Sequence, residues 1–418
     1  MKILWLVNIV MPELAVHLGE KPSVFGGWLS GALDAVRSAG HGLTICTTRE
    51  NAHEVRFCPD LNTTYLLLDT KTDFSNVLRK EEPDLVHIWG TEFPQAWALA
   101  SVSDPSRTLV SVQGFVHTYE NHVFAGIPEH ICRTNRLHRL LNRMGRHITS
   151  IEQQRLSFLQ RSDAEIRVLK RVGHVNGGTA WGDGCSQLQQ PGVQLHKCGL
   201  ILRSSFYGPA RWDPDAAEPH SIFTIYTYPI KGFHKFLEAL RLVADRYPDT
   251  KVYVAGNKCA FRRFTGLRKW IMDHAPDYDW YVQGLIERYG LRDNLVFLGY
   301  LSEEQMHERL LHSSVFVSAS SIENHSTALG EAMILGVPSV ASCVGGLQEM
   351  IDHGRDGFLY PFDETYTMAH QILRLFEDRA LAEQFSRLGH IHAARTYDRE
   401  QNRIDLLAMY DKIGGADK

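Results

Sequence analysis

The sequence predicts an α/β protein built on open, mostly parallel sheets with helices on both faces. Two observations predict this class. Short apolar runs recur along the 418 residues and are nearly continuous rather than alternating, which is typical of strands covered on both faces. Between them lie glycine-containing turns and stretches whose apolar residues follow helical spacing. This alternation of strand and helix occurs twice, once on each side of a proline-rich stretch.

The first half opens with a predicted strand at 2–10, followed by a helix at 26–40. Pro12 and Glu13 interrupt the opening apolar segment, which is too short to span a bilayer and lacks the cleavage site of a signal peptide. A buried first strand explains it better. The later elements predicted in this half are strands at 43–47, 65–68, 85–89 and 109–112 and a helix at 74–81.

The second half follows Pro209, Pro214 and Pro219, which mark a linker. Ser302 and Gln305 have the spacing of a capping box that opens a helix. The elements predicted here are strands at 222–227, 251–255, 295–298, 315–318 and 339–342 and helices at 232–247, 303–312 and 327–335.

The two halves therefore predict two Rossmann-like domains that face an interdomain cleft. We expect an N-terminal domain at 1–208, a linker at 209–219 and a C-terminal domain at 220–395. A final helix within 396–418 is expected to return and pack on the first domain. In such sheets ligands bind beyond the carboxyl ends of the strands.

The composition excludes several classes of protein. A net charge of −4, from 44 Lys+Arg and 48 Asp+Glu, lacks the basic field of a dedicated nucleic-acid-binding protein. The seven cysteines are scattered and form no Cys-x-x-Cys pair, which argues against a disulfide framework or a zinc ribbon. No window reaches transmembrane length, so we expect a cytoplasmic protein.

The strongest local signal spans residues 318–338. A strand is predicted to end near Ser318 and a helix to begin near Ser326–Thr327, so that the first-turn N–H groups form an anion site. Glu323 and Glu331 flank this site. Carboxylates beside an anion are useful where the anion carries hydroxyl groups, because ribose and hexose hydroxyls are good donors to carboxylates. An isolated pair of this spacing is more often a capped helix with a solvated glutamate, and the surrounding motifs change that balance.

Three further features favour a ligand site. Gly26-Gly27 opens a helix after the first strand, where a missing Cβ lets backbone approach a phosphate or sugar. Lys231-Gly232 places an ammonium at the end of the first strand of the second half. Gly345-Gly346 follows a later strand. Each has an ordinary alternative: a plain turn for the glycines, a solvated surface lysine for Lys231.

These motifs resemble those of glycosyltransferase family 4, which has the GT-B fold. Residues 320–362 carry the most specific part: E-x7-E, Ala-Met-x-x-Gly-Val-Pro, Gly-Gly-x-x-Glu-Met-Ile and Gly-x-x-Gly-Phe-Leu. Residues 231–232 match the family's Lys-Gly motif, and residues 26–27 its N-terminal glycine loop. Residues 177–181 are similar to a motif of a polysaccharide-biosynthesis subgroup.

The resemblance implies a retaining, metal-independent hexosyl transfer without a cofactor. The donor would be a nucleotide diphosphate sugar, with UDP the expected nucleotide, and the acceptor a saccharide or lipid-linked saccharide in surface polysaccharide biosynthesis. Glu331 would bind the ribose, Glu323 the donor sugar, and Lys231 the leaving diphosphate. The implied donor-binding positions are Gly26, Gly27, Lys231, Glu323, Asn324, His325, Ser326, Thr327 and Glu331.

The sequence departs from the family at two places. Many members carry Arg five or six residues before the Lys, where Ile225 or Tyr226 stands here, and Arg203 is a candidate replacement. Many also carry His where Gln113 stands. With Glu323 and Lys231, Gln113 completes the set of catalytic candidates. His117 is an acceptor-side candidate, although a lone loop histidine is more often merely solvated.

Residues 130–155 form a basic segment. They contain six Arg and three His against one acid, Glu152, and their leucines fall at helical spacing. The pattern predicts a basic amphipathic helix that contacts an anionic membrane on its inner face. A solvated basic face packed on its own sheet is the alternative.

Two other functions remain open on the sequence alone. A nucleotide-sugar epimerase shares the two-domain scaffold but would convert donor without acceptor. A non-catalytic nucleotide-sugar-binding protein would need only capture, for which two carboxylates beside an anion site exceed the requirement.

Overall fold

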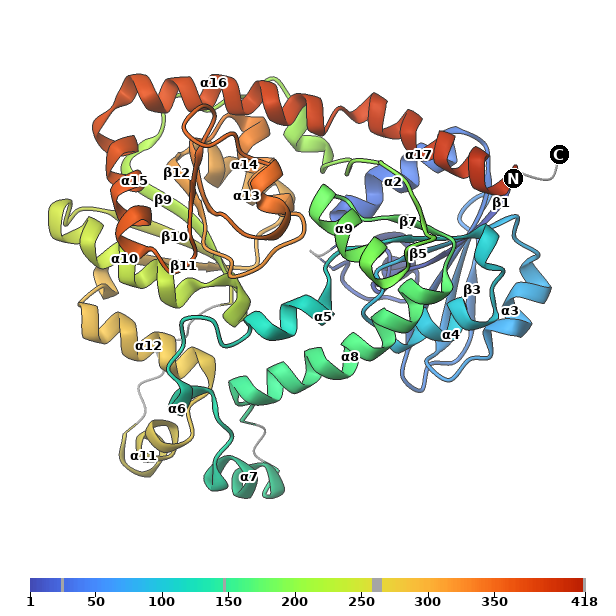
Figure 1. Ribbon diagram of the computed structural model, residues 1–418, viewed down its shortest axis with the longest axis horizontal. Helices are drawn as coiled ribbons and strands as arrows, with labels where there is room; N and C mark the ends of the chain where they lie inside the picture. The colour runs from blue at the N-terminus through green and yellow to red at the C-terminus, as the bar shows by residue number, and fades with distance from the viewer. Residues whose placement is uncertain (24–25, 146–147, 258–264, 416–418) are drawn as a thin grey trace. The chain divides into compact units, whose positions relative to one another are not determined.

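The computed structural model describes residues 1–23, 26–145, 148–257 and 265–415, and the chain forms two compact units (Figure 1). Unit 1 consists of Met1–His117, Gln160–Ser204 and Arg395–Lys418. Unit 2 consists of Thr118–Leu159 and Ser205–Ala394. Residues 118–159, which the sequence grouped with the N-terminal domain, pack with unit 2.

Unit 1 is built on an eight-stranded sheet in the order β3-β4-β2-β1-β5-β6-β7-β8. All neighbours are parallel except β3, which runs antiparallel to β4. The strands are β1 (Lys2–Leu6), β2 (Gly42–Arg49), β3 (Val55–Phe57), β4 (Thr63–Asp69), β5 (Leu85–Trp89), β6 (Thr108–Ser111), β7 (His174–Asn176) and β8 (Gln194–Leu195). The helices are α1 (Pro12–His17), α2 (Gly27–Ser38), α3 (Phe74–Glu81), α4 (Pro94–Val102), α9 (Ala180–Gln189) and α17 (Arg399–Gly414).

The core of unit 1 also includes a buried polar group. His87 on β5 is fully buried; its Nδ1 lies 2.6 Å from the hydroxyl of Tyr410 and its Nε2 lies 2.9 Å from Ser111 Oγ. Burial lowers the pKa of His87 well below its usual value, so the ring is neutral. Trp5 Nε1 also donates to the Tyr410 hydroxyl, at 3.0 Å. These bonds attach α17, which also packs against α2, to the sheet.

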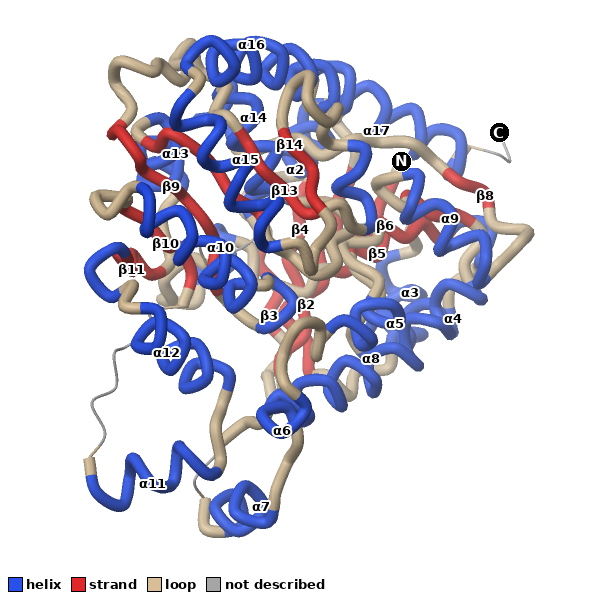
Figure 2. The backbone as a smooth tube through the Cα atoms, turned by 60° about the vertical axis from the view of Figure 1, so that its left-hand side comes forward, coloured by secondary structure: helices blue, strands red, loops and turns tan. Residues whose placement is uncertain are grey.

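Unit 2 is built on a six-stranded parallel sheet in the order β11-β10-β9-β12-β13-β14. The strands are β9 (Glu218–Tyr226), β10 (Lys251–Gly256), β11 (Leu295–Gly299), β12 (Ser313–Ser318), β13 (Ser339–Ser342) and β14 (Phe358–Tyr360). The larger helices are α10 (Phe233–Arg246), α12 (Tyr278–Tyr289), α13 (Glu303–Leu311), α14 (Thr327–Leu335), α15 (Thr365–Glu377) and α16 (Arg379–Thr396). α10 packs with α12 and α15, while α13 packs with α14, so helices cover the strands in two groups (Figure 2).

The predicted α/β class with mostly parallel sheets is confirmed. The helix predicted at 74–81 is α3. The capping box is present at the start of α13, where the Ser302 side chain accepts from the Gln305 N–H and the Gln305 side chain accepts from the Ser302 N–H. α1 was not predicted.

The proline-rich stretch is hydrogen-bonded to unit 2 at Trp212. Trp212 is buried; its backbone N–H donates to the Leu335 carbonyl and its Nε1 donates to the Ser313 carbonyl, both at 2.8 Å. The chain therefore joins unit 2 before β9 begins.

The expectation of one basic helix across residues 130–155 is wrong. The segment contains α6 (Glu129–Cys132), α7 (Arg136–Arg143) and the start of α8 (Ile151–Arg171). A capping box between Asn135 and His138 starts α7, and Gly145 follows it with a positive φ of 75°. Capping groups therefore divide the apolar periodicity. Arg146 and His147 lie outside the described residues.

Candidate functional site

The loop between β12 and α14 carries the strongest sequence signal. Ser326 caps α14, because its hydroxyl accepts a hydrogen bond from the Leu329 N–H at 3.3 Å. Thr327 is the first helical residue, as expected. Glu331 lies one turn inside α14 and is 2% exposed. The N-terminal end of α14 therefore has the positive polarisation that suits an anion.

Lys231 and Glu323, 92 residues apart, lie in direct contact. The lysine Nζ lies 2.5 Å from Glu323 Oε2, and the same oxygen accepts from Ser320 Oγ at 3.2 Å. Although burial opposes the charged form, the Glu323 carboxylate raises the pKa of Lys231 above its usual value. The structure thus places a permanent cation at the carboxyl end of β9.

Gly232 permits this arrangement. It has a positive φ of 65°, and a Cβ there would lie 1.8 Å from the Ala319 carbonyl oxygen. Only a glycine lets the turn that carries Lys231 approach the backbone of the loop after β12 this closely.

Gly345-Gly346 approaches the same loop from the end of β13. The Gly346 N–H donates to the Glu323 carbonyl at 3.0 Å. Gly345 has a positive φ of 50°, and a Cβ on it would lie 2.1 Å from that carbonyl oxygen. The predicted glycine pair therefore supports the backbone of Glu323.

A segment that sequence reasoning did not connect with this site also supports the loop. The Asn324 backbone N–H donates to the Tyr119 hydroxyl at 2.7 Å, and Ser321 Oγ donates to the His122 carbonyl at 3.1 Å. The Asn324 N–H therefore donates within the protein rather than into a ligand site. Nothing in the spacing around residue 119 could have indicated this contact.

His325, also among the predicted donor-binding positions, is an uncharged neighbour. Burial lowers its pKa to about 4, so the ring is neutral at physiological pH. Its imidazole adds polarity to the loop without adding charge.

The glycine turn of unit 1 lies against Arg203. Gly26 is the N-cap of α2 with a positive φ of 83°. A Cβ on Gly27 would lie 2.7 Å from Arg203 Cδ, so the aliphatic part of the arginine occupies the space that a side chain at this position would need. Arg203, the candidate replacement cation, is therefore next to the predicted phosphate-binding turn.

Gln113 belongs to a polar group at the carboxyl ends of β1, β5 and β6. Its Nε2 donates to the Trp89 carbonyl at 3.3 Å, and Asn8 Nδ2 lies 3.5 Å from its Oε1 and 3.4 Å from Glu92 Oε1. Glu92 was missed by the sequence analysis. Its Oε2 is buried and has no hydrogen-bond partner among the described residues, and burial raises its pKa to about 7.

His117 is held by a second carboxylate that the sequence analysis missed. Glu165 on α8 is fully buried, and its oxygens accept from His117 Nδ1 at 2.6 Å and from the His117 N–H at 2.9 Å. It also accepts from Thr91 Oγ1 at 2.9 Å and from the Val116 N–H at 3.2 Å. A carboxylate only accepts, so Nδ1 of His117 carries a proton that it donates to Glu165. His117 is therefore oriented rather than merely solvated.

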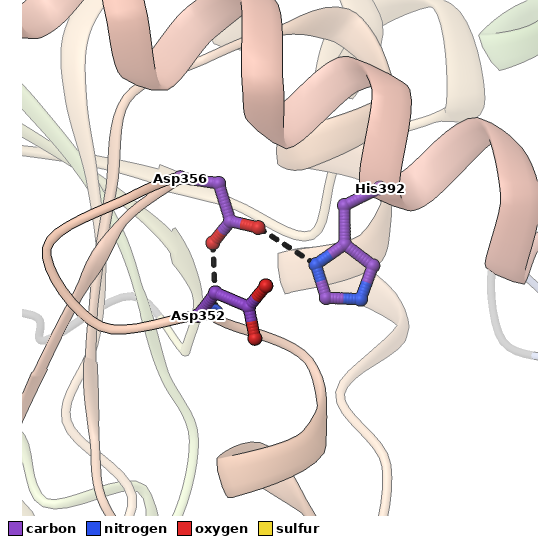
Figure 3. A group of neighbouring side chains, drawn as sticks. All are labelled: Asp352, Asp356 and His392. Carbon is purple, nitrogen blue, oxygen red and sulfur yellow. Dashed lines mark hydrogen bonds and ion pairs between the residues drawn. The ribbon is translucent and has the colours of Figure 1, made fainter.

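Asp352, Asp356 and His392 form a group with the composition of a metal site (Figure 3). The two oxygens of Asp356 already accept hydrogen bonds, from His392 Nδ1 and from the Asp352 N–H, each at 2.8 Å. This bonding raises the pKa of His392. The contact between His392 and Asp356 joins α16 to the loop before β14.

The predicted site residues thus fall into groups that each lie within one unit. Unit 2 brings together Lys231, Glu323 and the residues at the start of α14. Unit 1 brings Gly26-Gly27 beside Arg203, and it holds Gln113 and His117 in the segment that follows β6.

Comparison with solved structures decides the fold. Sucrose-phosphate synthase from Thermosynechococcus elongatus superposes with a TM-score of 0.67 at 16% identity, covering 100% of both chains. HepE of Anabaena, in complex with UDP-glucose, superposes with a TM-score of 0.65 at 15% identity, covering 99% of this chain and 100% of the other. The fold is GT-B.

Sequence comparison adds a family match to the second unit of this GT-B protein. Residues 218–390 match the family model of glycosyl transferases group 1. The chain is 26% identical over 168 residues to mannosylfructose-phosphate synthase of Agrobacterium fabrum, which covers 40% of this chain and 34% of that protein. It is 26% identical over 236 residues to alpha-D-kanosaminyltransferase of Streptomyces kanamyceticus, with coverages of 54% and 56%. The chain thus spans about a third to somewhat over half of these curated relatives.

Proposed function

We propose that this GT-B protein is a retaining glycosyltransferase. It transfers a hexosyl unit from a nucleotide diphosphate sugar, with UDP as the nucleotide, to a saccharide or lipid-linked saccharide acceptor in surface polysaccharide biosynthesis. The observation that carries the proposal is the contact between Lys231 and Glu323 beside the N-terminal end of α14. The group 1 family match covers this part of the chain.

The chemistry of the transfer explains this pair. When the bond between the anomeric carbon and the diphosphate breaks, negative charge develops on the departing phosphate oxygen. The Lys231 ammonium and the positively polarised end of α14 stabilise this charge without a metal ion. A bound diphosphate would draw Lys231 away from Glu323, whose carboxylate then accepts hydrogen bonds from the donor sugar. Glu331 holds the ribose hydroxyls.

Unit 1 supplies the acceptor-side groups in this proposal. Gln113 donates to a sugar hydroxyl, and His117 Nε2 accepts a hydrogen bond from another. Arg203 takes the place of the arginine that family members carry before the Lys-Gly motif. The proposed acceptor domain is 1–208 without residues 118–159, which pack with unit 2, and the proposed donor domain is 220–395.

The proposed location is the inner face of a membrane, where residues 130–155 contact anionic lipid. None of the helices within the described part of the chain combines the length and apolar character needed to cross a bilayer.

The test begins with purified full-length protein and a panel of UDP-, GDP- and ADP-sugars. Thermal shift measures binding, and nucleotide release measures turnover with and without saccharide acceptors. A nucleotide present at 100 times its Kd should stabilise the folded state by about 2.7 kcal/mol. We expect the UDP sugars to stabilise the protein and the anomeric configuration of the donor to persist in the product.

Two variants separate the roles of the site residues. Lys231→Ala should lose on the order of 3 kcal/mol of transition-state stabilisation, by analogy with the removal of an oxyanion donor. Glu331→Ala should raise the donor KM and weaken the binding of free UDP by the same factor. Lys251→Ala, at the amino end of β10, is the control and should retain normal turnover. Near-normal turnover of Lys231→Ala contradicts the proposed role of the lysine. Conversion of donor without acceptor would indicate an epimerase, and binding without turnover a capture protein.

A further inference from the structure

Two short helices from distant parts of the chain, both in unit 2, are linked at one end of each (both are labelled in Figures 1 and 2). The N-cap of α7 (Arg136–Arg143) is hydrogen-bonded to the last residue of α11 (Gly266–His274), and His138 of α7 is hydrogen-bonded to Pro276, just beyond α11. The Asn135 side-chain amide donates to the His274 carbonyl, and His138 Nε2 donates to the Pro276 carbonyl at 3.2 Å. These bonds hold the two helix ends next to each other, and we name the exposed residues of α11 and of α7 with its C-cap Met144 the α7–α11 surface.

Large apolar side chains on both helices face solvent. On α7 the buried Leu141 faces inward, and on α11 the buried Met272 does the same. The outer positions are apolar too, which is unusual for a monomeric surface helix. The exposed fractions are 54% for Leu140, 67% for Met144, 71% for Leu267 and 50% for Trp270.

Basic side chains surround these apolar positions. Arg136, Arg139 and Arg143 of α7 are exposed, and Glu152 is an acidic neighbour that interacts electrostatically with Arg139. α11 adds the exposed Arg268 and Lys269, of which Lys269 pairs with Asp273. The surface is therefore locally cationic on a chain whose formal net charge is −4.

We infer that the α7–α11 surface docks on an anionic lipid bilayer, with the apolar side chains of both helices entering the interfacial region. Arginine and lysine near the surface are attracted to anionic headgroups, while leucine, methionine and tryptophan insert at the boundary with the acyl chains. The combination of the two residue types favours a bilayer over a polyanion, since a nucleic acid would require the charges and not the exposed leucines.

The inference extends the peripheral location proposed above and rests on it, but not on the transfer reaction. The sequence suggested one helix within 130–155 as the contact. The inference adds the exposed Leu267 and Trp270 of α11, more than a hundred residues later. The α7–α11 surface also belongs to unit 2, which carries Lys231 and Glu323.

The test is cosedimentation of the full-length protein with two kinds of vesicle. One is phosphatidylcholine alone, and the other, the anionic probe, is phosphatidylcholine with about 30% phosphatidylglycerol. Wild-type protein should bind the anionic vesicles and release them in high salt. Each neutralised arginine, as in Arg136→Gln or Arg143→Gln, should lower the partition coefficient about fivefold.

The decisive variants remove apolar surface from one helix at a time. Leu140→Ala with Met144→Ala, and separately Leu267→Ala with Trp270→Ala, should each reduce vesicle binding at least about tenfold. Leu188→Ala, which truncates a leucine that is 84% exposed on α9, is the matched control and should bind normally.

The outcomes discriminate. Reduced binding for both pairs supports the inference. An effect of the α7 pair alone, or of the arginine variants without either apolar pair, overturns it, as does a wild-type protein that ignores anionic vesicles. UDP-sugar thermal shifts on the same samples test the transfer proposal separately. A protein that binds nucleotide but not vesicles would contradict the membrane-docking inference and leave the transfer proposal intact.

Discussion

The backbone N–H of Asn324 donates to the hydroxyl of Tyr119 at 2.7 Å, across 205 positions of sequence. Tyr119 follows the strand that leads to Gln113 and His117, whereas Asn324 lies in the loop that carries Glu323. One hydrogen bond therefore connects the order of the donor loop to a segment from the other half of the chain. Loss of this hydrogen bond should therefore weaken ligand binding at the donor loop.

Tyr119→Phe tests this connection. The substitution keeps the ring but leaves the buried Asn324 N–H without the hydroxyl, a loss of about 1–3 kcal/mol. We expect the affinity for UDP to fall, with little change in the overall fold by circular dichroism. Isothermal titration calorimetry measures the affinity of each variant for UDP. Tyr366→Phe, whose ring is 71% exposed, is the control. Equal UDP affinity in Tyr119→Phe and wild type would show that the bond does not order the loop.

Gly232→Ala tests the close approach of the Lys231 turn to the loop. Gly232 and Gly290 have nearly the same positive φ, 65° and 67°. A Cβ added at Gly232 would clash with the Ala319 carbonyl oxygen, whereas a Cβ added at Gly290 would have no neighbouring atom within 4 Å. Gly290→Ala should therefore cost only the backbone strain, about 1–2 kcal/mol. Gly232→Ala should cost that and about 1–3 kcal/mol more. Urea unfolding of both variants measures the difference, and equal losses would refute the clash.

Glu165→Gln tests the orientation of His117. Glutamine keeps one acceptor oxygen but turns an NH2 group toward the buried donors, so some donors lose their partner. We expect a loss of about 3 kcal/mol in the free energy of unfolding. We also expect the ¹⁵N signals of His117 to lose the fixed Nδ1–H tautomer. The exposed Glu383 of α16, paired with Arg379, offers the control Glu383→Gln, which should change stability by less than about 0.5 kcal/mol. An unchanged tautomer would remove Glu165 from its positioning role.

Glu92→Gln tests the buried carboxyl group beside Gln113. Burial raises the pKa of Glu92 to about 7, with Glu165 adding to the rise and Arg161 opposing it. The unfolded carboxyl has a pKa near about 4.3. Between these values the folded state binds more protons, so this group lowers stability progressively as pH rises from about 4 to 7.

The variant lacks this titration. Its free energy of unfolding relative to wild type should therefore rise between pH 4.5 and pH 8, by up to about 1.4 kcal/mol per pH unit. Urea unfolding at several pH values measures the difference. A constant difference over this range would mean that Glu92 is not shielded from water.

The local features of this protein follow from its sequence. Near-continuous apolar runs predicted the strands, and helical periodicity with a capping hydroxyl predicted the starts of α13 and α14. The Lys231-Gly232 pair could be placed at the carboxyl end of a strand because it directly follows the first apolar run of the second half. These signals act over a few residues, where backbone geometry and hydrogen bonding depend on immediate neighbours.

Contacts between distant residues depended on the tertiary structure. The spacing of Glu165 on its helix does not reveal that it receives four hydrogen bonds from the loops after β5 and β6. Nothing in the sequence around Glu92 indicates that its carboxyl group is buried beyond the end of β5. Likewise, the periodicity of 130–155 could not show that Asn135 caps a short helix beside α11.

By itself the sequence determined the α/β class, the positions of most strands and helices, and the loop that carries Glu323. Only the tertiary structure decided that Lys231 contacts Glu323, that Tyr119 supports the loop, and that α7 adjoins α11. The physical reason is range. Secondary structure arises from interactions along the chain, whereas these contacts form when folding brings separate segments together and buries their polar groups as pairs.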